Sequence, residues 1–383
     1  MSVVYSKPIQ IIVFKLTNDS FEQVGEVNQF DSLIWPDKFN GYSQFELWAP
    51  ITEENSKLFV EGNILWCRGE NAAIIEIVKS ATDSNGDEKY NIKGRTLEML
   101  LTTRILWGTY TAVKKKLSAI MYELVDKTCV NPANANRKIP FLELAEESAE
   151  FGSELSIQKT GGELYDALVD VASVDNFGFA VIFDPWNKRL IFKVIQGVDR
   201  SINQSVVDPV VFDTDFEDII TSSYYRNTQD VKSVALVAGE GEATERKIYV
   251  TGDNETKGFN RRELYIDARD IQSTVVNEDG TQVSLSIEDY MAALKQRGDE
   301  RMQEHKIYES FDAQVRVFGN VQYEFGKDYA KGDKVTVRDK RLNVTVSAQI
   351  TETEEDFDDE YALLLTFGFS YPTLMQKVKR QTT

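Results

Sequence analysis

Short apolar runs separated by turn signals are the feature that most limits what this chain can fold into. Residues 9–14 (IQIIVF) are rich in β-branched side chains, and residues 45–49 (FELWA) alternate apolar with polar before ending at Pro50. Asn85-Gly86 predicts a hairpin turn, because this dipeptide accepts the positive φ angles that a tight turn requires. Strands of this length and spacing predict a small β-barrel or sandwich in the N-terminal quarter of the chain.

A helical period replaces the strand pattern over residues 96–129. One predicted helix face collects Leu97, Leu100, Leu101 and Ile105, and continues after Gly108 through Val113, Leu117, Ile120, Met121, Leu124 and Val125. The only basic run, residues 114–116, falls on the exposed face of this predicted helix. A second helix is predicted after Gly161-Gly162, and residues 184–188 predict a hairpin turn. Together these signals predict an α/β insert.

The strand pattern returns in the second half of the chain. Runs of β-branched and aromatic residues recur from residue 206, and Ser286 is placed to cap a helix that extends to about Lys306. A terminal β block then follows, with strands predicted at 313–318, 334–338, 344–350 and 362–369. No repeat with a period of about 20–50 residues is visible.

The charge balance excludes several classes of protein. The 383 residues include 62 acidic and 43 basic side chains, for a formal net charge of -19. Proteins that grip nucleic-acid phosphates or anionic lipid surfaces need the opposite sign, so the simplest role of this charge is solubility. The N-terminus lacks the pattern of a secretory signal, and no apolar run approaches the ~20 residues of a membrane span, so we expect synthesis and folding in a cytoplasm.

Few residues are suited to catalysis or to metal binding. His305 is the only histidine, in a predicted polar helix with no nucleophile nearby, and we interpret it as solvated. The two cysteines, Cys67 and Cys129, form no CxxC pair; buried free thiols are favoured over a disulfide. A carboxylate pair of the glycosidase type stays open, because 62 acidic residues guarantee many chance pairs. No glycine-rich phosphate-binding motif is present.

Two acidic segments could in principle hold a cation. Residues 83–88 begin like a calcium loop, but Glu88 stands at the sixth place, where glycine is needed, and Gly94 at the twelfth. A hairpin turn is therefore the favoured interpretation. Residues 352–360 contain seven carboxylates, and we predict a solvated loop between two strands in preference to a cation site.

Three stretches together resemble one protein family. Residues 90–106, in which a strand reaches Gly94-Arg95 and runs into a short helix, resemble the G-[RYF]-[ST]-L-x-x-L-L-x-x-R stretch of siphophage tail-tip hub proteins, the family that includes the N-terminal hub part of tail-associated lysins. Residues 329–337 resemble the GD-x-V-x-V signature of the last hub barrel, and 344–352 with 362–368 resemble its closing strands. The matches lie in the family's order, although residues 105–205 contain none.

The resemblance implies a fold related to the baseplate hub of contractile phages. We expect an α+β, β-rich multidomain chain with two β-barrel-like hub domains plus smaller α/β domains. The expected borders are 1–104 for the first hub domain, 105–205 for the α/β insert, 206–308 for a mixed β/α domain that partly completes the first barrel, and 309–383 for the second hub domain. Either barrel could draw on distant segments.

The family also implies a structural role without catalysis. Three subunits would form a pseudo-sixfold ring that joins the distal tail protein and tail tube to the tip, next to the tape-measure protein and other baseplate components. DNA would pass without specific binding through a bore for which residues 352–360 are a candidate acidic lining. We therefore expect a virion protein with no catalytic, cofactor-binding or metal residues. The alternative is a carbohydrate-binding or cell-wall-degrading tail protein, since 16 Tyr, 5 Trp and many carboxylates could build a sugar site.

Overall fold

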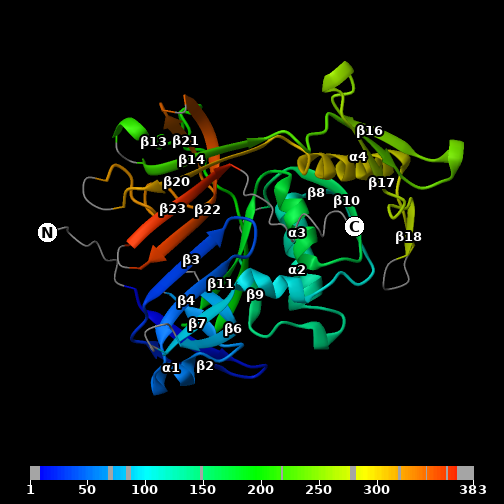
Figure 1. Cartoon of the computed structure of the whole chain (residues 1–383). Coiled ribbons are helices and arrows are strands. Elements are labelled where there is room, and N and C mark those ends of the chain that lie inside the picture. Colours follow the sequence, from blue (N-terminus) through cyan, green and yellow to red (C-terminus); the bar gives the residue numbers. More distant parts are fainter. Residues whose placement is uncertain are drawn as a thin grey trace.

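One large sheet organises the molecule (Figure 1). The computed structural model describes residues 9–67, 72–82, 88–146, 150–216, 219–276, 282–317, 321–341, 343–358 and 361–368. Thirteen strands belong to this sheet, and eleven of them follow the order β14-β20-β23-β22-β3-β4-β7-β6-β5-β1-β2, with β21 and β13 attached beside β22. Strands β22 and β23, near the C-terminal end, thus lie beside β3 and β4, near the N-terminal end (Figure 1).

The strands of the large sheet come from both ends of the chain. The N-terminal group comprises β1 (Ile11–Leu16), β2 (Phe21–Val27), β3 (Ser32–Lys38), β4 (Gln44–Pro50), β5 (Ile64–Trp66), β6 (Ala72–Thr82) and β7 (Glu88–Thr96). The C-terminal group comprises β13 (Val211–Asp213), β14 (Ile219–Asn227), β20 (Tyr308–Val315), β21 (Lys334–Asp339), β22 (Val344–Phe357) and β23 (Tyr361–Gly368). The short helices α1 (Glu53–Leu58) and η4 (Thr214–Phe216) connect strands within these groups.

The predicted β-rich character is confirmed, but no barrel is closed in the described part of the chain. Strand β22 of the C-terminal group pairs with β3 of the N-terminal group. The two groups therefore form one continuous sheet, and neither closes by pairing its last strand with its own first strand. Strands β13 and β14, which come from the predicted 206–308 region, pair with β21 and β20 and not with strands of residues 1–104. Cross-strand pairing between the groups therefore takes the place of barrel closure.

Each group of strands packs over its own apolar core. In the N-terminal core, Trp35 stacks on Phe45 with ring centroids 5.4 Å apart. In the C-terminal core, Phe311 meets Phe367 edge to face at 6.2 Å. The two cores lie on the same face of the sheet, because Trp35 of the first core faces Glu355 of β22, which in turn faces Leu363 of the second core.

A third core combines the segment between the two groups with side chains of the N-terminal strands β1, β2 and β5, such as Phe14 and Trp66. It includes η1 (Leu97–Thr103), β8 (Thr109–Lys116), α2 (Leu117–Val125), the π-helical turn η2 (Asp126–Val130), η3 (Ala135–Arg137), β9 (Leu142–Leu144), β10 (Glu154–Thr160), α3 (Leu164–Ser173), β11 (Gly178–Asp184) and β12 (Arg189–Ile195). Strand β8 corrects the predicted helix: it alternates β-branched residues and pairs with β10, so strand pairing overrides the helical period there. The basic run 114–116 consequently ends a strand. The predicted hairpin at 184–188 is confirmed.

A fourth unit packs a helix on a small sheet. Its strands are β15 (Val234–Ala238), β16 (Ile248–Gly252) and β17 (Glu263–Asp267), and α4 (Ile287–Gln303) covers one face; η5 (Ala243–Glu245), η6 (Gly258–Asn260), β18 (Thr274–Val276) and β19 (Gln282–Ser284) lie between them. The predicted cap is confirmed, since Ser286 Oγ accepts the Asp289 N–H at 3.1 Å. Helix α4 ends before His305, whose Nδ1 lies 3.0 Å from the carbonyl oxygen of Asp230.

The acidic segment at 352–360 is largely a strand and not the predicted solvated loop. Residues 352–357 pair with β23 on one side and with β3 on the other, so the carboxylates stand within the sheet. Hydrogen bonding along both edges of β22 outweighs the mutual repulsion of these charges. Residues 359 and 360 lie outside the described part, as do residues 83–87 of the candidate calcium loop.

Both thiols are free, as predicted. Cys129 is buried in the π-helical turn, and burial raises its pKa to about 12 despite the nearby guanidinium groups of Arg104 and Arg137. Burial, with a contribution from Glu355, also raises the pKa of the Cys67 thiol. Neither cysteine is therefore activated as a nucleophile.

Candidate assembly interface

The large sheet contains the same strand arrangement twice. Strands β3-β4-β7-β6 form one four-stranded block and β14-β20-β23-β22 form the other, and both run first, second, fourth, third in chain order. The last strand of the second block, β22, pairs antiparallel with the first strand of the other block, β3. Two blocks of one topology are thus joined head to tail within a single chain.

The registers of the two blocks also agree. Strand β6 has a bulge at Glu76, next to the pair Ile75↔Gly94, and strand β22 has one at Thr351, next to the pair Ile350↔Phe367. A bulge inserts one residue into one strand of a pair, so its position marks the register unambiguously. Glu76 and Thr351 are therefore equivalent positions.

The same glycine turn precedes β5 and β21, the strands that pair with β6 and β22. Gly62 precedes β5 with φ 88°, and Gly332 precedes β21 with φ 94°. Each glycine N–H donates to the carbonyl oxygen just before the bulge, on Ile75 or on Ile350, at 2.8 Å. Because L side chains disfavour such positive φ values, both turns call for glycine. The correspondence thus covers five strands in each half.

The junction between the blocks is well supported. Across β22 and β3, Glu354 faces Pro36 and Asp356 faces Ile34. Lys331, just before β21, forms an ion pair with Asp37 of β3, and both side chains are mostly buried. The junction therefore combines strand pairing with a charged contact.

Within the described residues, two strand edges of the repeated blocks have no paired strand. On β6, residues 72–74 pair with β5, whereas residues 77–82 pair with β7 alone. At the other end of the sheet, β14 pairs only with β20 among the described strands. Unpaired edges of this kind are templates for strand addition.

The sheet face opposite the two block cores carries charge. In the C-terminal block, Glu352, Glu354 and Asp356 line up at alternate positions of β22, and burial raises the pKa of each, with neighbouring carboxylates adding to the effect. In the N-terminal block, Glu46 on the same face bonds Lys93 at 2.9 Å. The face is thus acidic over β22, whereas over the N-terminal block it also carries the basic side chains Lys79, Lys93 and Arg95.

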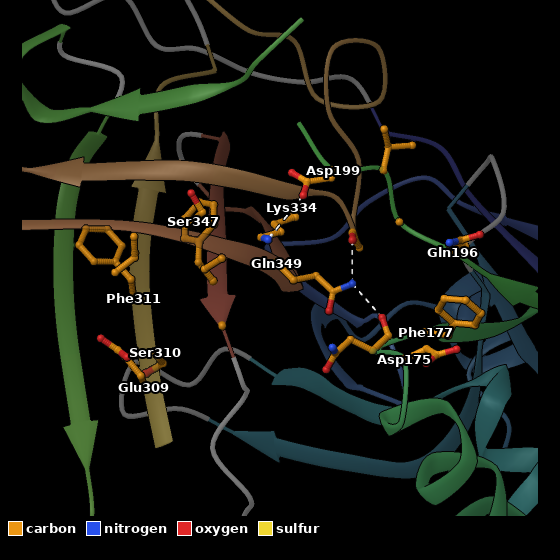
Figure 2. Close-up of a pocket in the computed structure, with 18 of the residues that line it drawn as sticks. Asp175, Phe177, Gln196, Asp199, Glu309, Ser310, Phe311, Lys334, Ser347 and Gln349 are labelled. Carbon is orange, nitrogen blue, oxygen red and sulfur yellow. Dashed lines mark hydrogen bonds and ion pairs between the residues drawn. The ribbon is translucent and has the colours of Figure 1, made fainter. Parts of the chain in front are cut away.

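A groove of about 560 Å³ opens beside the second block (Figure 2). Gln349 spans it, donating to the carbonyl oxygens of Asn176 at 2.9 Å and Gly332 at 2.8 Å. The carboxylates that line the groove have partners within the chain. Asp175 accepts hydrogen bonds from Ser153, Glu309 accepts one from the Tyr224 hydroxyl, and Asp199 forms an ion pair with Lys334. This arrangement is typical of structural contacts and not of a catalytic carboxylate pair.

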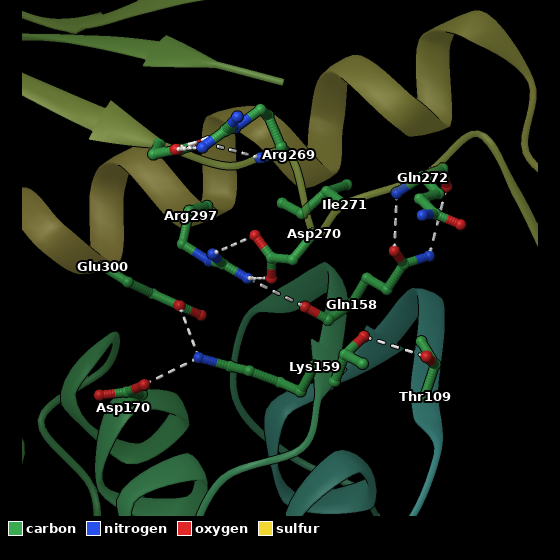
Figure 3. Close-up of polar contacts among 12 residues, drawn as sticks. Thr109, Gln158, Lys159, Asp170, Arg269, Asp270, Ile271, Gln272, Arg297 and Glu300 are labelled. Atoms are coloured by element: carbon green, nitrogen blue, oxygen red, sulfur yellow. Dashed lines mark hydrogen bonds and ion pairs between the residues drawn. The ribbon is translucent and has the colours of Figure 1, made fainter. Parts of the chain in front are cut away.

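A polar clamp joins the third and fourth units (Figure 3). Lys159 of β10 reaches between Asp170 of α3 and Glu300 of α4, with its Nζ 2.8 Å from an oxygen of each. Burial alone would lower the pKa of Lys159, but attraction to Glu300 and Asp170 more than offsets this and raises it. Arg297 adds an ion pair with Asp270 at 2.8 Å.

A second groove lies beside the π-helical turn. Trp107 is 53% exposed, and the Arg137 guanidinium lies 4.3 Å from its ring centroid. Tyr110 and Lys127 form a similar pair at 5.5 Å, with Asn134 also lining the groove. The groove thus combines aromatic rings with the cationic side chains of Arg137 and Lys127, a lining suited to a polar or anionic ligand.

Comparison with known proteins identifies the family. The family model described as Siphovirus ReqiPepy6 Gp37-like protein matches residues 13–368. The chain belongs to this family. The predicted resemblance to a siphophage tail protein family is therefore confirmed. No curated protein matches the chain.

Solved phage tail proteins share the fold. The tail protein from Neisseria meningitidis MC58 superposes with a TM-score of 0.54 at 13% identity, covering 95% of this chain and 97% of that one. Prophage tail protein gp18 from Listeria monocytogenes EGD-e gives 0.53 at 14% identity, covering 97% and 98%. The 43 kDa tail protein of prophage MuSo2 from Shewanella oneidensis gives 0.54 at 12% identity, covering 94% and 98%.

The described residues contain no cluster of three or more His, Cys, Asp or Glu side chains that could hold a metal ion. Within the same residues, no helix is long and apolar enough to cross a membrane. The duplicated block escaped prediction from sequence, because equivalent strands lie about 190 to 275 residues apart and share few side chains. The paired signals Gly62-Asn63 and Gly332-Asp333, each followed by a strand, could have revealed it.

Proposed function

We propose that this family member is the structural hub of a phage tail tip, and that three copies close into a ring with pseudo-sixfold symmetry. The observation that carries the proposal is the repeated four-stranded block, joined head to tail within one chain. A head-to-tail contact that is used again between chains gives a closed ring if the rotation closes. Two blocks in each of three chains then present six similar units to a sixfold tail tube.

The ring has neighbours on both sides. Above it lie the distal tail protein and tail tube, and inside or next to it the tape-measure protein and other baseplate components. The chain works as a virion component that carries out no bond-breaking step. Its partnered groove carboxylates and its single, backbone-bonded histidine support this role.

DNA passes through the ring without specific binding. The sheet face opposite the cores is the wall of the bore in this proposal, with the carboxylates of β22 directed into it. Negative side chains repel phosphates, whereas a basic wall would release counterions and bind them. In the other block, Lys93 and Arg95 on this face are each paired with a carboxylate, Glu46 or Glu76, which reduces their attraction for phosphate.

Mass measurement with imaging tests the hub. Native mass spectrometry of the full chain, alone and with the distal tail protein, is expected to give a trimer, and electron microscopy a ring on the tube end. A monomer that never assembles on the distal tail protein contradicts the proposal. Enzyme-like turnover of purified cell wall by the chain would also contradict it.

The groove beside Trp107 favours a second candidate function, glycan binding by a tail protein. Trp107 is 53% exposed and offers an apolar ring together with a polar N–H, which suits a ligand with both apolar and polar parts. Binding of purified cell-wall polysaccharide that is lost in Trp107→Ala would support this candidate. Trp186→Ala, which also removes an exposed tryptophan but one outside the lining of this groove, is the matched control. Equal binding by both variants rules out the groove.

A further inference from the structure

The internal junction supplies a template for a contact between chains. Strand β22 ends one block and β3 begins the next, and these strands pair antiparallel. The matching strands at the outer ends of the two blocks are β6 and β14. In the part of the chain that the structure describes, both outer strands have an open edge, and that of β6 runs along residues 77–82.

We propose that β6 of one copy pairs antiparallel with β14 of the next copy, in the register of the β22–β3 junction. The proposed occupant of each open edge is therefore a second copy of this chain. This inference rests on the ring proposed above and adds to it the strands and the register that close it. Main-chain hydrogen bonds across the added pair supply the attraction, as in other strand additions.

The equivalence on the β6 side follows from the bulges. Glu76 corresponds to Thr351. Ala81 and Asp356 each lie five residues after these bulge positions, so they also correspond. In the internal junction Asp356 faces Ile34 of β3. The partner of Ala81 is thus the residue of β14 that corresponds to Ile34.

Pairing within each block gives that residue on β14. Phe45 faces Gly94 in one block, and Phe311 faces Phe367 in the other, at equivalent positions beside the bulge. The next residues along these strands, Glu46 and Asp312, are therefore equivalent. Glu46 faces Ile34 of β3, and Asp312 faces Ser223 of β14. Ser223 therefore corresponds to Ile34, and Ala81 of one copy faces Ser223 of the next.

The resulting cross-strand pairs are chemically compatible. The register places Ile77 opposite Asn227, Lys79 opposite Tyr225, and Ala81 opposite Ser223. Ile77 is 50% exposed and Tyr225 42% exposed in the single chain, so the contact removes apolar surface from water. The Lys79 ammonium and Tyr225 ring are a favourable cross-strand pair. No like-charged residues face each other in this register.

Disulfide trapping tests the register. Residues opposed in antiparallel strands have Cα atoms about 4.5–5.5 Å apart, within the range that a disulfide spans. The full-length variant Ala81→Cys/Ser223→Cys is expected to give a covalent trimer on oxidation of assembled rings, lost on reduction. The matched control Ala81→Cys/Thr221→Cys shifts one thiol by two residues and is expected to stay uncoupled. Ile34→Cys/Asp356→Cys, the equivalent pair within one chain, shows that this geometry oxidises.

Single variants test the head-to-tail sense. Ala81→Cys and Ser223→Cys are each expected to stay monomeric on a denaturing gel after oxidation, and their mixture to give covalent dimers. Rings that form but give no cross-link with the first pair, or equal cross-linking with the shifted pair, overturn the register while leaving the ring intact. If wild-type chain forms no ring by mass and imaging, the hub proposal fails, and this contact fails with it.

Discussion

The pKa of the Glu98 carboxyl is set by the buried position of its side chain. Glu98 follows the Gly94-Arg95 corner and is only 7% exposed, with Oε1 accepting the Val181 N–H at 2.9 Å. Burial, together with repulsion from Asp37, raises the pKa of this carboxyl above its ordinary value of 4.5. The carboxylate therefore ties η1 to β11 at a cost in desolvation.

Glu98→Gln is expected to raise the free energy of unfolding at neutral pH. A glutamine oxygen still accepts the Val181 N–H but carries no buried charge. Because the folded pKa lies above the unfolded one, the stabilising contribution of Glu98 is complete below the ordinary pKa and is lost as pH rises through the folded pKa. Denaturant unfolding between pH 4 and 8 is expected to show this loss in wild type and not in the variant.

Glu98→Leu is the contrasting variant. It removes the acceptor of the Val181 N–H and is expected to cost about 1–3 kcal/mol relative to Glu98→Gln. Equal stability of the two variants contradicts the structural role of this hydrogen bond.

At the scale of elements, β22 places acidic side chains in the interior of the sheet, between β23 and β3. Glu352, Glu354 and Asp356 share one face and have raised pKa values, chiefly because burial disfavours their charged forms. The triple variant Glu352→Gln/Glu354→Gln/Asp356→Asn is therefore expected to be more stable than wild type at neutral pH, by about 1 kcal/mol. The gain is expected to shrink as pH falls and these carboxyls become protonated, which thermal unfolding across pH measures. A less stable variant at pH 7 contradicts this account.

The close approach of β6 and β7 requires a residue without a side chain. A Cβ on Gly94 would lie 1.8 Å from the carbonyl oxygen of Ile74. Gly94→Ala is therefore expected to lower the free energy of unfolding by about 3 kcal/mol, measured by urea unfolding. Gly161→Ala is the control, since no atom lies within 4 Å of its Cβ position and only its φ of 68° opposes alanine, at about 1 kcal/mol.

At the scale of the whole molecule, the fourth unit is held to the third by charged contacts. Lys159→Met leaves Glu300, with a side chain only 6% exposed, buried without its ammonium partner. We expect a loss of about 3–5 kcal/mol in the docking of α4, seen as faster hydrogen exchange across that helix. Lys295→Gln removes an exposed ion pair of the same helix and is expected to change stability by less than about 1 kcal/mol. Unchanged exchange in Lys159→Met contradicts a clamp.

Local structure was largely predictable from the chain itself. Alternation at residues 45–49, the Ser286 cap and the 184–188 hairpin depend on neighbours a few residues away, so periodicity and turn chemistry predict them. The Gly94-Arg95 corner and the terminal strands also carried enough pattern to indicate the tail protein family. The position of His305 in a polar segment favoured a solvated side chain over a catalytic one for the same local reason.

Tertiary structure decided what depends on distant partners. Residues 109–116 have a mixed pattern, and they form a strand because they pair with β10. The acidic sequence of residues 352–357 predicts a solvated loop, but pairing with β3 and β23 makes this segment a strand. The pairing of β22 with β3 joins segments more than 300 residues apart, and loop closure over that length leaves no signal in local periodicity. Local sequence thus determined most of the strands. Pairing between distant edges determined the remaining strands and the joining of the two four-stranded blocks into one sheet, because those contacts depend on residues far apart in the chain.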